Sequence, residues 1–178
     1  SEIARLEDRV LRTEAPPVAV ETARKAIERL RHPSIRALDG ISLQAYVDWS
    51  LSLPWSTTAD EQIDIVKARR AFDARHFGLE EARSRLIEFL SVRRLVGTHG
   101  PSLLAILGPP GTGRTRLGQA VAEAMARPFV RISLRGVHDE DSIRGRPLTE
   151  PAPRPGRILE ELRASGVCNP VMLIDDID

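Results

Sequence analysis

One short segment constrains the fold of this chain more than any other. It reads Gly108-Pro109-Pro110-Gly111-Thr112-Gly113-Arg114-Thr115, and it lies between an apolar run at 102–107 and a helical pattern at 116–126. Glycine, four residues, glycine, a basic residue and then Ser or Thr is the spacing of a phosphate-binding loop. The glycines let the backbone wrap around a phosphate, and the start of the next helix adds favourable partial charge. The segment therefore predicts a strand–loop–helix unit that holds a phosphate group.

The last two residues of this loop have distinct expected roles. Thr115 would ligate Mg²⁺, and the basic residue before it would touch the outer phosphates of a nucleotide. That basic residue is Arg114, where the pattern asks for lysine. Arginine keeps the positive charge, but its side chain is longer, planar and forked, so the exchange is not neutral at a tight site. A glycine-rich turn without any ligand remains the alternative interpretation.

A second motif lies at 171–176, where four apolar residues precede Asp175 and Asp176. An apolar strand that ends in carboxylates is the Walker B arrangement. Asp175 would hold Mg²⁺ through water, and the next acid, usually Glu, would polarise the attacking water. Asp176 is one methylene shorter, whereas general-base geometry allows only about 2.6–3.2 Å between heavy atoms. We therefore expect Asp176 to be a poor activator of water; a pair of acids that merely caps a strand is the alternative.

The first third of the chain is predicted to be helical. Pro16-Pro17 separates the first two helices, Pro17 can open the second, and an Asp39-Gly40 turn precedes a shorter third one. A linker at 52–56 follows, with Trp55 expected to be buried or half-buried. The apolar stripes recur at helical spacing: Ile3, Leu6, Val10 and Leu11; Val20, Ala23, Ile27 and Leu30; Leu43, Tyr46, Val47 and Ser50.

From residue 57 onward the pattern changes from helices alone to alternating strands and helices. Thr58 and Glu61 have capping-box spacing, which predicts a helix at 59–72; a second helix follows Gly78, with Leu79, Ala82, Leu86, Phe89 and Leu90 on its apolar face. Strands are expected at 102–107, 129–134 and 171–174, with helices at 116–126 and 158–165 and an irregular stretch at 135–155. This order predicts an α/β fold, in which a helical bundle segment precedes a parallel sheet covered by helices.

Composition excludes several classes of protein. The 26 basic and 25 acidic side chains nearly cancel, to a net charge of +1, which argues against a chain that coats nucleic acid or an anionic membrane. No apolar run approaches the roughly 20 residues that span a bilayer, and 1–5 lacks the form of a signal peptide. The single Cys168, expected to be buried or half-buried, excludes an internal disulfide and fits a reducing compartment. A cytoplasmic location is therefore expected.

Taken together, these segments resemble the middle of a Lon protease. The matching stretches occur in order along almost the whole chain, at 46–49, 53–55, 72–73, 76–80, 87–93, 108–115, 129–134, 142–145, 155–158 and 169–170. The resemblance implies that 1–56 is the end of the helical N-terminal region. It also implies that 57–178 is the large α/β subdomain of an AAA+ module, incomplete at its C-terminus.

The resemblance also implies an activity, a cofactor and partners. Lon enzymes are hexameric rings of identical subunits that use ATP and Mg²⁺ to drive unfolded protein into a chamber with a Ser-Lys dyad. His76, Phe77 and Gly78 match the stretch against the adenine, and Thr149, Glu150 and Pro151 match the pore loop that grips substrate. No catalytic serine matches within this sequence, so we expect the chain by itself to hydrolyse neither ATP nor peptides.

Three departures from the family pattern affect phosphate binding, water activation and substrate binding, which are the three steps of ATP-driven translocation. Arg114 replaces the lysine of the phosphate loop, Asp176 replaces the Walker B glutamate, and an acid with prolines replaces the aromatic and small apolar residues at 149–153. An acid cannot wedge against an apolar polypeptide as an aromatic ring does. The departures predict that ATP-driven translocation is weakened or lost.

Three hypotheses follow for the function. The module is a degenerate scaffold and gate for ATP-independent degradation, or part of an ordinary ATP-powered Lon, or a nucleotide-binding structural module without turnover. They predict no nucleotide binding, binding with turnover and binding without turnover, respectively. Nucleic acid is a less favoured partner: a solvated or inter-subunit role is preferred for the arginines at 131, 135, 144, 146, 154 and 157.

Overall fold

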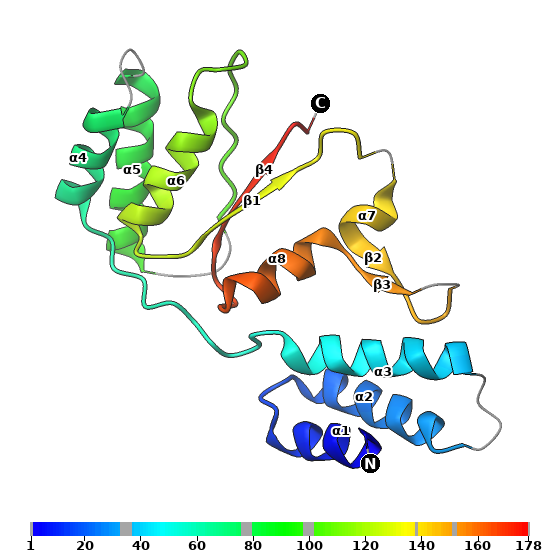
Figure 1. Ribbon diagram of the computed structural model, residues 1–178. Helices are drawn as coiled ribbons and strands as arrows, with labels where there is room; N and C mark the ends of the chain where they lie inside the picture. Colours follow the sequence, from blue (N-terminus) through cyan, green and yellow to red (C-terminus); the bar gives the residue numbers. More distant parts are fainter. Residues whose placement is uncertain are drawn as a thin grey trace. The chain divides into compact units, whose positions relative to one another are not determined.

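The computed structural model describes residues 2–32, 37–75, 80–97, 102–137, 139–150 and 153–177. The chain divides into two compact units (Figure 1). The helical unit comprises Ser1–Thr58, Ile132–Cys168 and Asp176–Asp178, and the phosphate-loop unit comprises Ala59–Arg131 and Asn169–Asp175. Among the described residues, no helix is long and apolar enough to cross a membrane.

Three helices form the core of the helical unit: α1 (Glu2–Arg12), α2 (Pro17–Leu30) and α3 (Ala37–Ser52). Pro17 lies at the start of α2, as predicted, where the missing N–H costs nothing. The predicted stripes supply the core, except that Leu11 is 76 % exposed. Leu11 directly follows the buried Val10, and neighbours on a helix point about 100° apart. The buried core residues are Leu6, Val10, Ala23, Ala26, Ile27, Leu43 and Val47.

The third helix is longer than predicted, and the expected turn at Asp39-Gly40 is wrong. Both residues lie in the first turn of α3, where an acidic side chain is favoured by the helix dipole. Burial of Leu43 and Val47 outweighs the local turn preference of the Asp-Gly pair. Trp55, which follows α3, is 38 % exposed rather than buried, and its indole N–H donates to the Ser50 carbonyl at 2.7 Å.

The stretch predicted to be irregular contains regular structure. It holds α7 (Glu140–Arg144) and an antiparallel hairpin of β2 (Gly145–Arg146) and β3 (Arg154–Pro155), followed by the expected helix α8 (Arg157–Ser165). Gly145 has φ +87°, and a Cβ there would lie 2.6 Å from the Arg154 carbonyl oxygen. Only glycine fits at this close approach of two backbones. The hairpin leaves no hydrophobic periodicity in the sequence because each of its strands has only two residues.

The phosphate-loop unit combines helices with a small parallel sheet. It contains α4 (Ile65–Arg75), α5 (Glu80–Val96) and α6 (Arg114–Ala124), and α6 packs against β4 (Val171–Asp175). Strand β1 (Phe129–Ser133) pairs with β4 (Figure 1), which confirms the predicted α/β class. The buried core is formed by Ala68, Phe72, Leu86, Ile87, Leu90, Leu117, Ala120, Val121, Ala124 and Met125.

Helix α4 begins later than predicted, because the capping box does not form. The carboxylate of Asp64 accepts hydrogen bonds from the backbone N–H groups of Val66 and Lys67, at 2.9 and 3.0 Å, and so caps the helix instead. Glu61, the expected capping partner, is 9 % exposed and binds two arginines. Arg93 Nε donates to it at 2.7 Å and Arg127 Nη1 at 3.0 Å. These pairs fix the extended segment at 59–64.

The apolar run before the phosphate loop is not a strand, in contrast to the prediction. Leu103 and Leu107 are 97 % and 95 % exposed, and only Ile106 packs against the core. Within the described part of the chain, β1 and β4 pair with each other and neither pairs with this run.

The prediction for Cys168 is also wrong: its side chain is exposed, in the turn between α8 and β4, and its N–H donates to the Thr57 carbonyl.

Candidate functional site

The phosphate loop folds as a tight turn that leads directly into α6. Gly111 and Gly113 have φ values of +83° and +87°, a region that costs other residues about 1–2 kcal/mol. Thr112 Oγ1 donates to the Pro109 carbonyl at 2.9 Å. Gly113 is the residue before α6, so no side chain caps the first amides of that helix. The loop therefore has the two properties that an anion site needs: a glycine backbone that can curve and uncapped helical amides.

Arg114 folds back over its own loop. Its guanidinium Nη1 donates to the carbonyl oxygen of Gly108 at 2.7 Å. The positive charge therefore stays at the loop, as the sequence predicts, but one of its donors binds the backbone rather than pointing outward. A lysine has no fork and would present a single ammonium group.

The structure brings Thr115 and Asp175 together, although 60 positions separate them. The Thr115 hydroxyl lies at the start of α6 and Asp175 at the end of β4, and Thr115 Oγ1 donates to Asp175 Oδ2 at 3.5 Å. The Asp175 side chain is 14 % exposed. These are the two residues that the sequence assigns to Mg²⁺; a role in binding the ion stays a prediction.

Arg131 is a site residue that sequence reasoning did not assign. Its Nη2 donates to Asp175 Oδ2 at 2.7 Å. The signal was present in the alternation of β1, where Val130 and Ile132 are buried and Arg131 between them is exposed. Arg131 is the middle residue of β1, and because β1 pairs with β4 its long side chain can reach the end of β4.

Asp176 combines a left-handed backbone with polar contacts to Ser133 and Arg135. Its φ is +59°, a value that is uncommon outside glycine but that aspartate adopts more often than most residues. Ser133 Oγ donates to Asp176 Oδ2 at 3.0 Å, and Arg135 Nε lies 3.7 Å from the same oxygen. The carboxylate expected to polarise water is therefore engaged by a hydroxyl and a cation.

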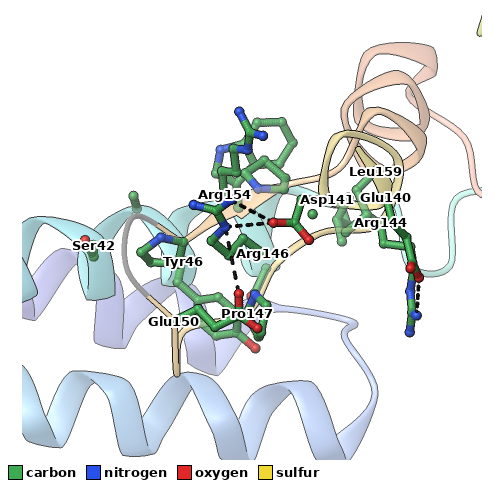
Figure 2. A pocket seen from close by; sticks show the side chains of 17 residues that line it. Ser42, Tyr46, Glu140, Asp141, Arg144, Arg146, Pro147, Glu150, Arg154 and Leu159 are labelled. Atoms are coloured by element: carbon green, nitrogen blue, oxygen red, sulfur yellow. Dashed lines mark hydrogen bonds and ion pairs between the residues drawn. The ribbon is translucent and has the colours of Figure 1, made fainter. Parts of the chain in front are cut away.

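The pore-loop position carries an ion-pair network. Arg146 Nη2 donates to Asp141 at 2.7 Å, and Arg146 Nε lies 3.8 Å from Glu150, whose side chain is half exposed. The hydrogen bond with Asp141 raises the pKa of Arg146. Figure 2 shows these groups side by side. They line a cavity of about 780 Å³, together with Tyr46 and Trp49. The acid in this loop is thus tied to α7 through Arg146.

Part of the predicted site lies outside the described residues. His76, Phe77 and Gly78, expected against an adenine, are among these, as is Pro151 of the pore loop. Thr149 and Glu150 are described and lie in the turn that follows the Pro147 carbonyl, to which the Glu150 N–H donates.

The motifs of this site lie within a region that matches known proteins in sequence. Residues 104–178 match the family model "ATPase family associated with various cellular activities (AAA)". The chain is 44 % identical over 178 residues to a Lon protease of Methylocella silvestris, covering 99 % of this chain and 22 % of the relative. It is 43 % identical to a Lon protease of Paraburkholderia phytofirmans over 179 residues, again 99 % and 22 %. These matches support a fragment of a Lon protease.

The chain spans about a fifth of the length of the curated relatives it matches, 22 % in the first two comparisons and 20 % for a Lon protease of Anaeromyxobacter dehalogenans. AAA domains generally bind nucleotide. Lon and other AAA+ proteins generally form oligomeric rings and act on protein substrates.

The residues present fit Mg²⁺ by type but not by arrangement. A hydroxyl and a carboxylate are the hard oxygen ligands that this ion prefers, and Thr115 and Asp175 supply them. However, the Asp175 oxygen that faces Thr115 also accepts a hydrogen bond from the Arg131 guanidinium. In this arrangement the guanidinium of Arg131 contacts the oxygen that would bind the ion.

Proposed function

We propose that this chain is part of a Lon-like protease whose AAA+ module is a scaffold and gate rather than a motor. The parent protein would form a homo-hexameric ring in the cytoplasm and degrade unfolded or small proteins without ATP hydrolysis. Residues 1–56 would end the helical N-terminal region, and 57–178 would begin the AAA+ large subdomain. The Ser-Lys dyad would lie outside these residues.

The observation that carries this proposal is the engagement of Asp176. A general base must accept a hydrogen bond from the attacking water at about 2.6–3.2 Å. Asp176 Oδ2 instead accepts from Ser133 at 3.0 Å and lies 3.7 Å from Arg135 Nε. The Asp176 oxygen that would accept a hydrogen bond from the water is therefore already occupied by the Ser133 hydroxyl, with a cation beside it.

Two further features support the same conclusion. One N–H donor of the Arg114 guanidinium is bonded to its own loop at Gly108 and is not available to a phosphate. Glu150, at the pore-loop position, carries a charge that interacts with Arg146 instead of an aromatic face for an apolar substrate. The residues at the three positions are Arg114 at the phosphates, Asp176 at the attacking water and Glu150 at the substrate. Each differs from the residue that the family uses for ATP-driven translocation.

The test is steady-state ATP hydrolysis by the full-length parent protein, beside an Arg114→Lys/Asp176→Glu double variant. We expect no protein-dependent ATP hydrolysis by the unmodified protein and undiminished casein degradation without ATP. Clear ATP turnover by the unmodified protein would refute the scaffold proposal. Failure to degrade casein without ATP would refute the ATP-independent activity.

A specific observation also favours a second candidate, an AAA+ module that still binds ATP or ADP, with or without turnover. The loop keeps its left-handed glycines, and Thr115 Oγ1 lies 3.5 Å from Asp175 Oδ2, so the two oxygen groups expected to bind Mg²⁺ lie together. Equilibrium binding of ADP to the parent protein distinguishes this candidate from an empty scaffold, and turnover distinguishes a motor from a sensor.

A further inference from the structure

The loop between β2 and β3, residues 147–153, reaches the hydrophobic core of the three N-terminal helices. Leu148 of this loop is half-buried and packs against the core residues of α1, α2 and α3. Among the described members of that core cluster, it is the only one from outside the three helices. The loop that holds the pore-loop position is therefore docked on the N-terminal helices through a leucine.

Contacts that do not involve these helices give the loop its shape. The Glu150 N–H donates to the Pro147 carbonyl at 3.1 Å, which closes a turn around Leu148. Arg146 joins this turn to α7, because its Nη2 lies 2.7 Å from Asp141 and its Nε lies 3.8 Å from Glu150. The turn can therefore keep its shape when Leu148 leaves the helices.

The docked loop does not pack closely along α3. Tyr46 and Trp49 of α3 line one cavity of about 780 Å³ with Pro147 and Glu150, which lie on either side of Leu148 in the sequence (Figure 2). Burial of a leucine side chain in part shifts an equilibrium by about tenfold at most. A contact of this size favours the docked loop but also allows it to leave and return.

The same loop departs from the family pattern. The resemblance to Lon proteases covers 142–145 and 155–158, and the loop lies between these stretches. It contains three prolines, which limit rotation of the backbone, besides Leu148 and Glu150. A contact made by this loop can therefore give the chain a property that the family pattern does not contain.

We propose that the contact of Leu148 with the three N-terminal helices holds the entrance gate closed, and that substrate enters when this contact opens. The inference deepens the proposed function and rests on it for the role of the loop at the entrance. It names the interaction that controls the gate. Because this interaction is apolar and lies within one chain, opening it requires neither nucleotide binding nor ATP hydrolysis.

The first experiment measures docking of the loop in the full-length parent protein, without reference to activity. Leu148→Cys and Thr149→Cys place a thiol at the docked position and at the exposed position beside it. Both variants are treated with iodoacetamide, and mass spectrometry follows the label on the loop peptide. We expect the thiol at 148 to react about threefold or more slowly than the thiol at 149, because docking covers it.

The second experiment measures opening of the gate. Casein degradation and hydrolysis of a short fluorogenic peptide, which does not need the open gate, are compared in the unmodified protein and in Leu148→Ser, with and without ATP. We expect casein degradation to become about three- to tenfold faster in Leu148→Ser, because serine loses the apolar contact. Peptide hydrolysis should not change.

Two controls separate release of the loop from a general loss of packing. Leu11→Ser removes a leucine of α1 that is 76 % exposed, so its casein degradation should equal that of the unmodified protein. Leu148→Met keeps the apolar contact and should restore slow degradation. Circular dichroism verifies folding, and Leu148→Ala provides a second variant if Leu148→Ser does not fold.

Each outcome decides the inference. Equal labelling at 148 and 149 overturns it, and so does casein degradation that is unchanged, slower or absent in a folded Leu148 variant. An equal gain in peptide hydrolysis or in Leu11→Ser also overturns it. A gain confined to casein and to the variants that lose the apolar contact supports it. ATP turnover by the unmodified protein decides the proposed function separately, so the two failures are distinguishable.

Discussion

Two arginine–carboxylate clusters in the phosphate-loop unit use the same chemistry in different surroundings. In one, Glu61 contacts Arg93 and Arg127, and all three side chains are between 9 % and 13 % exposed. In the other, Asp175 contacts Arg131, whose side chain is 48 % exposed. Little water can reach the first cluster to replace a lost partner, whereas water can reach the exposed Arg131 side chain in the second. Burial therefore makes the first cluster important for stability. The second cluster can exchange its arginine contact for water or a ligand.

The Glu61 cluster also connects segments that are distant in the sequence. Arg127 donates to the Pro170 carbonyl at 3.2 Å as well as to Glu61. The side chain of Asn169 binds the backbone of Ala59 through both its oxygen, at 2.7 Å, and its nitrogen, at 3.0 Å. The cluster thus holds the segment before α4 against the start of β4, which ends at the candidate site.

The largest effect is expected from Glu61→Gln. Removing this carboxylate leaves two buried guanidinium groups without a counter-charge, which typically costs about 3–5 kcal/mol. Urea unfolding followed by circular dichroism should show this loss in the free energy of unfolding. A loss below about 1 kcal/mol would place this cluster with ordinary surface pairs.

The loss of stability at low pH should also depend on the Glu61 cluster. Burial acts to raise the pKa of Glu61, but the hydrogen bond and charge of Arg93, followed by Arg127, lower it overall from 4.5. Because the folded pKa lies below the unfolded one, the stabilisation is complete above pH 4.5 and is lost as the pH falls through the lowered value. Unfolding free energies measured at decreasing pH should therefore fall more steeply in the unmodified protein than in Glu61→Gln; parallel curves would contradict this assignment.

A smaller effect is expected from Arg131→Met. The partly exposed pair with Asp175 should contribute about 0–1 kcal/mol to stability, since water replaces the guanidinium. The same urea titration measures this value. A loss as large as that expected for Glu61→Gln would show that Arg131 is a structural residue, in which case the comparison between the two clusters does not hold.

The smallest effect is expected from Glu88→Gln, which provides the baseline for both clusters. Glu88 pairs with Arg85 at 3.1 Å on the surface of α5, and both side chains are mostly exposed. Such a pair contributes about 0.3–0.5 kcal/mol. Unfolding in high salt should abolish this contribution while leaving most of the Glu61 effect, because salt screens exposed charges more than buried ones.

Elements with strong periodicity were predicted well, whereas those fixed by side-chain partners were not. The spacing of Leu117, Val121 and Met125 predicts α6, and all three are buried. The Thr58–Glu61 spacing predicts a helix start that does not occur, because Glu61 pairs with arginines 32 and 66 positions away. Local spacing contains no information about partners at such a distance.

In the candidate site, too, the residues themselves were predicted from local sequence, whereas their distant partners were not. Loop spacing and the apolar strand before Asp175 predict which residues belong to it, and the structure places Thr115 beside Asp175. The partners of the acids were not predicted: Arg131 on Asp175, and Ser133 with Arg135 on Asp176. These side chains reach the acids only once β1 lies next to β4.

The sequence by itself determined the class of fold, the family and the position of the phosphate loop, because glycine spacing and hydrophobic periodicity are properties of neighbours along the chain. Only the tertiary structure decided which charges meet. Pairing of β1 with β4 brings Arg131 to Asp175, and packing of 59–64 brings Glu61 to Arg93 and Arg127. The strength of each charge–charge interaction depends on how much water surrounds the pair. Because side chains become buried only when the chain folds, the sequence alone does not give this strength.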